Sequence, residues 1–102
     1  MPTITAEALT DFATRIFECS NVPTDKASAV ARSLVLANLK GHDSHGVIRI
    51  VEYVDWIQRG WVDPYGELEI VREQTGILIL DGHFGFGQVI GRKALELAIP
   101  RA

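Results

Sequence analysis

The side chains best able to do chemistry lie in residues 41–49, which read GHDSHGVIR. Histidine exchanges a proton near neutral pH, so His45 can protonate a substrate carbonyl or accept the proton of a hydroxyl group. Arg49 carries a planar group of donors that matches a carboxylate, and Ser44 can relay or orient the proton. The three residues together predict an acid/base group and an anion clamp at one site.

A helix that began in this stretch would bring the acid/base group and the clamp together. If it starts near Ser44, His45 and Arg49 are i and i+4 neighbours, with Cβ atoms about 5–6 Å apart. Free N–H groups at a helix N-terminus would attract negative charge further, as a small carboxylic acid requires. The structural alternatives stay open: Asp43 or Ser44 can serve as a helix cap, and His45 and Arg49 can be ordinary surface residues.

Two other chemistries use the same residues. His42, Asp43 and His45 are potential zinc ligands, although zinc sites usually need three or four well-placed donors, and we expect no metal. Ser44 and His45 could belong to a hydrolase, but adjacent residues need not face each other and no GxSxG motif accompanies them.

A glycine-rich segment at residues 85–91, GFGQVIG, follows an apolar run and precedes a helical pattern, much as a dinucleotide-binding turn does. Its glycine spacing differs by one residue from the Rossmann fingerprint. That fingerprint also needs a second parallel strand and an acidic residue about 20 positions further on, which the 102 residues do not reach. The pattern favours a loop and packing role, and we predict no cofactor-binding residue here.

Three amphipathic helices are expected to position the 41–49 segment. Thr5 and Thr24 are the predicted caps of the first two, and Gly41 and Gly60 are the predicted stops of the second and third. Apolar residues recur with helical period in three sets: Leu9, Phe12, Ala13, Ile16 and Phe17; Ala27, Val30, Ala31, Leu34 and Val35; and Val47, Ile50, Val51 and Val54.

The pattern changes in the second part of the chain. Apolar and polar residues alternate from Glu67, residues 74–76 read as a turn, and residues 77–80 are all apolar, which predicts a β-hairpin. A helix is predicted from Gln88 to about Ile99. The expected fold class is therefore α+β, with a helical region at 1–62 and a hairpin plus helix at 63–102.

Composition excludes several classes of protein. A chain of 102 residues with 47% hydrophobic residues is typical of one globular domain, and a net charge of -3 provides no basic surface for nucleic acid. No run reaches the roughly 20 apolar residues that span a membrane, and the first residues lack the pattern of a secretory leader. The single cysteine, Cys19, suits a reducing compartment, so we expect a cytoplasmic protein.

On these residues the chain resembles the type-2 malate/L-lactate dehydrogenases, a non-Rossmann family dependent on NAD or NADP, with ureidoglycolate, sulfolactate and cyclic-imino-acid relatives. The resemblance runs along nearly the whole chain. Its anchors are ANLKGHDSHGVIR at 37–49, Tyr53, Gly60, Asp81 with Gly82, and GFGQ at 85–88.

The resemblance implies hydride transfer between NAD(P) and a 2-hydroxy or 2-oxo acid such as malate or lactate, or a cyclic imine with a carboxylate. It gives proton transfer to Ser44 and His45, and the substrate carboxylate to Arg49. Family members are longer and usually dimeric, and their cofactor residues and a His-Phe-Gly motif lie beyond residue 102. We therefore expect an amino-terminal fragment, inactive alone and part of a larger fold. The HFG at 83–85 occupies another loop and receives no role.

A competing hypothesis from another class is a non-catalytic helical module that binds a protein partner. It rests on the short chain and on Trp56 and Trp61, which could anchor such a partner.

Overall fold

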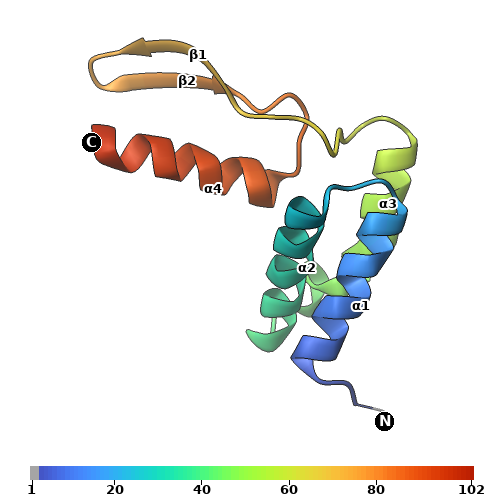
Figure 1. Cartoon of the computed structure of the whole chain (residues 1–102). Helices are drawn as coiled ribbons and strands as arrows, with labels where there is room; N and C mark the ends of the chain where they lie inside the picture. The colour runs from blue at the N-terminus through green and yellow to red at the C-terminus, as the bar shows by residue number, and fades with distance from the viewer. Residues whose placement is uncertain (1–2) are drawn as a thin grey trace.

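The computed structural model describes residues 3–102 as an α+β fold, which confirms the predicted class. The helices are α1 (Ala6–Cys19), α2 (Thr24–Leu39), α3 (Ile50–Gln58) and α4 (Gly87–Ala98), and the strands are β1 (Glu69–Gln74) and β2 (Ile77–Asp81). Short 3-10 turns occupy Asp43–His45, Val47–Arg49 and Ile99–Arg101. Figure 1 shows α1, α2 and α3 packed side by side, with the hairpin and α4 extending away from them as an arm.

Helices α1 and α2 form the main core. Phe17 is fully buried, and it packs in one apolar cluster with Val30 and Leu34 of α2. Thr5 caps α1 as predicted, because its hydroxyl accepts the N–H of Ala8 at 3.1 Å. Phe12, which was expected in the buried stripe, is 60% exposed.

The predicted cap of α2 is wrong. Pro23 holds the N-cap position, and the Thr24 hydroxyl instead donates to Glu18 at 2.9 Å. Both glycine stops are confirmed. Gly41 and Gly60 have φ of 82° and 77°, the left-handed conformation that ends a helix at little cost when the residue has no Cβ.

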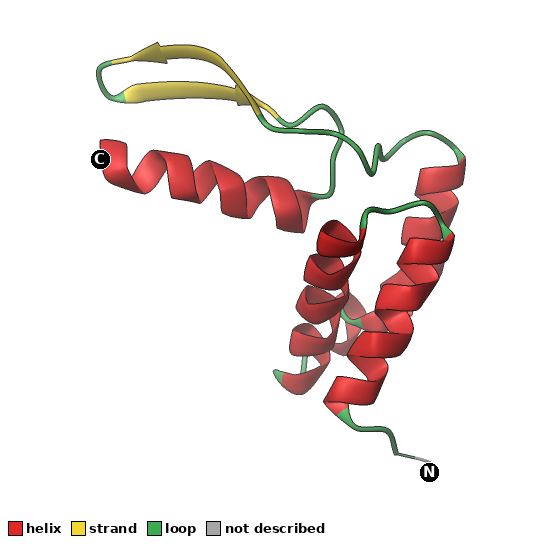
Figure 2. Ribbon diagram, in the orientation of Figure 1, coloured by secondary structure: helices red, strands yellow, loops and turns green. Residues whose placement is uncertain are grey.

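The hairpin is antiparallel, with Gln74 opposite Ile77 across the turn and an irregularity between Ile70 and Arg72. Strand β1 begins at Glu69, two residues later than the alternating pattern suggested, and is exposed along its length. Figure 2 shows α4 running beneath the hairpin, and the Arg101 guanidinium binds Glu73 at 2.9 Å near the tip.

Contacts between the arm and the helices set the position of α4. Phe86 and Val89 are buried in the same core cluster as Phe17. The Nζ of Lys26, a buried residue, donates to the Glu67 carboxylate at 2.7 Å and to the Gly66 carbonyl at 3.3 Å. The core therefore continues across residues 62 and 63, and the division of the chain there into two domains stays a prediction.

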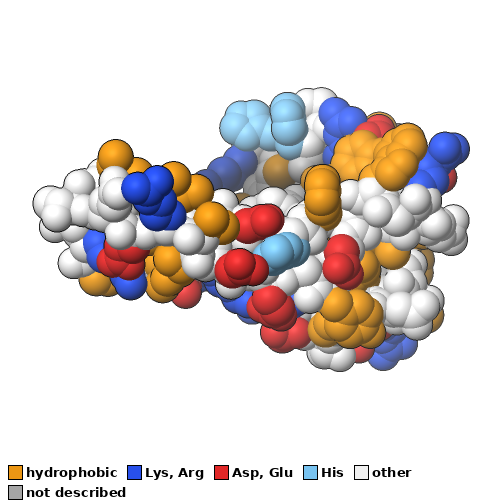
Figure 3. Space-filling model, turned by 90° about the horizontal axis from the view of Figure 1, so that it is seen from above, with side chains coloured by type: hydrophobic (Ala, Val, Ile, Leu, Met, Phe, Trp, Pro, Cys, Tyr) orange, Lys and Arg blue, Asp and Glu red, His pale blue; other side chains and the backbone are white. Residues whose placement is uncertain are grey.

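The surface of the arm keeps apolar side chains exposed, among them Ile77, Ile79, Leu95 and Ile99. Seen from above in Figure 3, hydrophobic side chains lie along the arm and acidic side chains gather near the middle of this face. Within residues 3–102, no helix has the length and apolar character needed to cross a membrane.

Candidate functional site

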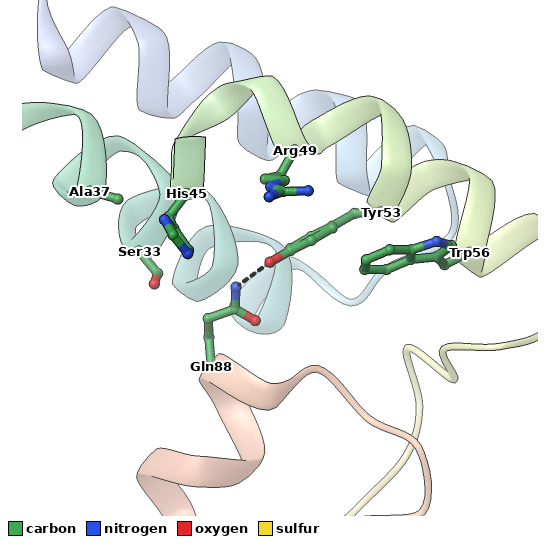
Figure 4. Close-up of a pocket in the computed structure, with 7 residues that line it drawn as sticks. All are labelled: Ser33, Ala37, His45, Arg49, Tyr53, Trp56 and Gln88. Atoms are coloured by element: carbon green, nitrogen blue, oxygen red, sulfur yellow. Dashed lines mark hydrogen bonds between the residues drawn. The ribbon is translucent and has the colours of Figure 1, made fainter. Parts of the chain in front are cut away.

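A cavity of about 370 Å³ opens where α2, α3 and the start of α4 meet. This volume is at the lower end of the range for small-molecule sites. Figure 4 shows the lining side chains converging from three helices and the segment before α3. They are Ser33, Ala37, His45, Arg49, Tyr53, Trp56 and Gln88.

The 41–49 segment is not the start of a regular helix. Two 3-10 turns, separated at Gly46, precede α3, and neither Asp43 nor Ser44 caps α3, whose N-cap position is taken by Arg49. The sequence prediction of the cap and of the helix start is therefore wrong. His45 and Arg49 nevertheless line the same cavity, although the break at Gly46 means that they are not successive turns of one helix.

Asn38, near the end of α2, fixes the shape of this segment. Its Oδ1 accepts the Val47 backbone N–H at 2.9 Å, and its Nδ2 donates to the Asp43 carboxylate at 2.8 Å. Gly46 is buried against the same amide, and a Cβ at that position would lie only 2.2 Å from Asn38 Oδ1. One amide side chain and one missing Cβ thus set the path of the backbone between the two 3-10 turns.

Ser44 and His45 form a hydrogen-bonded pair. Ser44 Oγ lies 3.0 Å from His45 Nδ1, and either atom can donate, depending on the tautomer. This contact leaves Nε2 as the ring nitrogen available to a ligand, and Figure 4 shows the His45 ring directed into the cavity. Ser44 itself does not line the cavity, so it contacts the site through His45.

The Arg49 guanidinium is held by its own chain. Its Nε donates to the Ser44 carbonyl oxygen at 2.7 Å, and its Nη1 donates to both carboxylate oxygens of Glu52 at 3.0 and 2.9 Å. These contacts fix the guanidinium at the cavity wall. The sequence predicted a guanidinium with all its donors free for a carboxylate. This prediction is incomplete, because Glu52 already accepts hydrogen bonds from Nη1.

Sequence reasoning gave no site role to five of the seven cavity residues, Ser33, Ala37, Tyr53, Trp56 and Gln88. Tyr53 and Gln88 entered as anchors of the resemblance, Gln88 also as the expected start of a helix, and Trp56 as an anchor for a partner. Tyr53 lies four residues after Arg49 and Trp56 three further on, so both occupy the same side of α3, a signal that helical period could have supplied. Gln88 comes from α4, and its Nε2 donates to the Tyr53 hydroxyl at 2.9 Å (Figure 4).

The structure also bears on the alternative chemistries. No group of three or more potential metal ligands occurs within residues 3–102, and Asp43 is engaged by Asn38. Ser44 does face His45, but it does not line the cavity, where a nucleophile would have to be. Trp61, the second candidate partner anchor, is 60% exposed beneath the Arg59 guanidinium.

Gly82 and Gly85, at the start of the glycine-rich loop, pack closely against other residues. A Cβ on Gly85 would lie 3.0 Å from the Gly66 carbonyl oxygen and from Ile90, and a Cβ on Gly82 would lie 2.8 Å from Ile90. Gly82 and Gly85 thus permit close packing of the loop against α4. A Cβ on Gly87 or Gly91, the other glycines of the 85–91 segment, would meet nothing within 4 Å.

His83 lies outside the cavity, beside the hairpin. Its Nε2 is 2.8 Å from Glu69, and this hydrogen bond is the largest cause of a pKa raised above the ordinary histidine value. The negative charges of Asp81, Glu69 and Asp63 raise the pKa further, and partial desolvation opposes them. Protonated His83 therefore favours the folded hairpin.

Replacing Glu69 with glutamine should lower the pKa of His83 toward its ordinary value. Because the folded-state pKa is raised, the pair stabilises the fold fully below the unfolded-state pKa of histidine, and this contribution is lost as pH rises through the folded-state pKa. NMR titration of the His83 ring and melting temperatures on both sides of that range measure the effect. Glu73→Gln on the same strand is the control and should leave the His83 titration unchanged; an unshifted titration in Glu69→Gln would contradict the assignment.

Comparison with known proteins adds to this geometry. The family model for malate/L-lactate dehydrogenase matches residues 4–102. The chain is 40% identical over 99 residues to a malate dehydrogenase of Pyrococcus abyssi, covering 97% of this chain and 27% of that protein. It is 41% identical over 81 residues to an L-sulfolactate dehydrogenase of Methanocaldococcus jannaschii, covering 79% of this chain and 24% of that protein.

The fold matches a solved structure of malate dehydrogenase from Pyrococcus horikoshii OT3 with a TM-score of 0.92 and 37% identity, covering 99% of this chain and 29% of that one. The chain thus spans about 27% of the length of the malate dehydrogenases that it matches in sequence.

Proposed function

Since the chain belongs to the malate/L-lactate dehydrogenase family, we propose that its cavity binds the carboxylate of a small 2-hydroxy or 2-oxo acid and handles the proton of an NAD(P)-dependent hydride transfer. The observation that carries this proposal is the meeting of His45 and Arg49 at one cavity. The cavity joins a proton-exchanging ring to a cation, which is the combination that a 2-oxo acid requires.

His45 is proposed as the acid/base group. In the reductive direction its Nε2 gives a proton to the carbonyl oxygen while the carbonyl carbon receives hydride, and in the oxidative direction Nε2 takes the proton of the hydroxyl group. Ser44 is a positioning residue, because its hydroxyl holds Nδ1 and thereby the direction of the ring. The remaining role, holding the substrate carboxylate, falls to Arg49.

The nicotinamide cofactor, NAD or NADP, would supply or accept the hydride. Gly82 and Gly85 pack closely against Ile90 and Gly66, and we propose no dinucleotide site in this loop. No step is therefore assigned to cofactor contacts in this chain. We place the cofactor site in the part of a family-length protein that this chain does not match, and we propose a homodimer as the assembly.

The reaction is tested with the protein produced from the intact gene. Oxidation of NADH and NADPH is followed with pyruvate, oxaloacetate and a cyclic imino acid, together with the mass and oligomeric state of the purified protein. Turnover with at least one of these acids supports the proposal. A well-folded protein that oxidises neither cofactor with any of them contradicts it and favours the non-catalytic module.

Replacing Arg49 with lysine should raise KM for the acid by roughly tenfold, with a smaller change in kcat. Lysine keeps the charge but loses the planar donors, and hydrogen bonds to charged groups are worth about 1.5–3 kcal/mol. Steady-state kinetics measure the change. Arg59→Lys is the matched control, since Arg59 also pairs with an acidic residue of α3 but lies outside the cavity. Equal KM values in the two variants would remove Arg49 from the substrate site.

A further inference from the structure

The hydrogen-bond donors of Arg49 are partly used, and this limits how it can bind a carboxylate. A guanidinium has five N–H donors, and the Ser44 carbonyl takes Nε while Glu52 takes Nη1. Among residues 3–102, Nη2 is the one nitrogen of this group without a hydrogen-bond partner. While Glu52 stays in place, Nη2 is the Arg49 nitrogen left for a carboxylate in the cavity, and a second donor at the cavity wall could share the carboxylate with it.

The Tyr53 hydroxyl is oriented to provide that donor. Its oxygen accepts the N–H of Gln88 at 2.9 Å, so its own hydrogen must be directed elsewhere. Within the described part of the chain no acceptor for this hydrogen is recorded, and the side chain lines the cavity. In Figure 4 the hydroxyl points toward the space between His45 and Gln88, and Arg49 lines the same cavity.

Packing holds the ring in this position. The Tyr53 ring stacks on Trp56 with centroids 5.4 Å apart, and it lies 6.3 Å from Phe17 and 6.2 Å from Phe86. Two of these neighbours, Phe17 and Phe86, belong to the buried core. A ring enclosed in this way cannot swing away, so its hydroxyl is a fixed donor at the cavity wall.

We infer that Tyr53 donates to the second oxygen of the substrate carboxylate, beside Arg49, and that Gln88 is a positioning residue that directs the Tyr53 hydrogen into the cavity. This inference rests on the proposed function and specifies its binding step. It makes recognition of the carboxylate depend on residues of α3 and α4 together. A ligand with an amide in place of the carboxylate offers one acceptor oxygen instead of two and should lose this shared contact.

Replacing Tyr53 with phenylalanine should weaken binding of L-malate and L-lactate by roughly tenfold, the order expected for loss of one hydrogen bond to a charged group. The ring and its packing remain. Dissociation constants are measured by following backbone amide signals of the isotopically labelled chain during titration with each acid and with lactamide. Tyr65→Phe is the matched control, because Tyr65 is 64% exposed and lies outside the cavity.

Gln88→Leu provides the second variant. If Gln88 acts only by directing the Tyr53 hydrogen, this change weakens acid binding in the original chain but adds little in the Tyr53→Phe background. A purely structural role would instead weaken lactamide binding equally and leave the two effects additive.

The outcomes distinguish a failure of this inference from a failure of the proposed function. Acid binding that is weakened by Arg49→Lys but unchanged by Tyr53→Phe overturns the role of Tyr53 and leaves the proposed function intact. If the amide signals of cavity residues in the original sequence respond to neither L-malate nor L-lactate, the proposed substrate site is contradicted, and this inference with it. Selective loss of acid binding in Tyr53→Phe supports both.

Discussion

Replacing His45 with glutamine should lower kcat/KM for reduction of the 2-oxo acid by roughly 10²–10⁴-fold, the usual contribution of a positioned acid/base group. Glutamine keeps polar atoms near the same place but cannot exchange a proton. The Arg49 contacts with Ser44 and Glu52 do not involve the imidazole, so acid binding should change much less than turnover. Steady-state kinetics on the protein from the intact gene, with NADH and NADPH, measure both quantities.

His42→Gln is the matched control for this prediction. His42 belongs to the same segment and is exposed, but it does not line the cavity. Turnover should stay near its original value in this variant. The turnover of Ser44→Ala should lie between those of His45→Gln and His42→Gln, because this change removes the partner of Nδ1 without removing the ring. Near-normal turnover in His45→Gln would exclude His45 as the acid/base group, whatever the other two variants do.

The sequence was sufficient for features that depend on local backbone chemistry. Thr5 caps α1 because a hydroxyl just before a helical stripe can accept a free N–H group of the first turn. Gly41 and Gly60 follow the ends of their helices in the left-handed conformation, which would strain a residue with a Cβ. The same local rules misplaced the cap of α2, since Thr24 found a partner in Glu18 instead.

The 41–49 segment could not be predicted in detail, because side chains outside it determine its shape. Asp43 and Ser44 are good cap residues in isolation, yet Asp43 is bound by Asn38. That contact depends on how the end of α2 approaches Gly46, which periodicity does not describe. His45 and Arg49 line one cavity, while the regular helix assumed for them is absent.

The other contacts at the site differ in how far the sequence could predict them. Glu52 follows Arg49 by three positions, so the ion pair that restrains the guanidinium was within reach of the i,i+3 rule. The contact of Gln88 with Tyr53 could not be predicted in this way, because the two residues are 35 positions apart and meet only when α4 folds back on the core. Contacts of this kind depend on tertiary packing, and neither helical period nor a motif contains them.

Replacing Gly46 with alanine should distort the whole site without touching a reacting group. The new Cβ would meet the Asn38 amide at 2.2 Å, and this amide cannot withdraw without releasing Val47 and Asp43. Overpacking of a buried position costs about 1–3 kcal/mol of folding free energy. A shift of about 1 Å in a catalytic group can reduce turnover by about 10²-fold. Thermal unfolding and steady-state kinetics measure the two losses separately.

Gly91→Ala is the matched control, because a Cβ at that position in α4 meets nothing within 4 Å and should leave stability equal or slightly higher. The mechanism itself is tested in an Asn38→Ala background. That change alone should be destabilising, since Val47 and Asp43 lose their partner, but it also removes the atoms with which the new Cβ collides. Adding Gly46→Ala should then cost little more. Fully additive losses would mean that Gly46 is required for another reason, and that Asn38 does not set the geometry from which His45 and Arg49 reach the cavity.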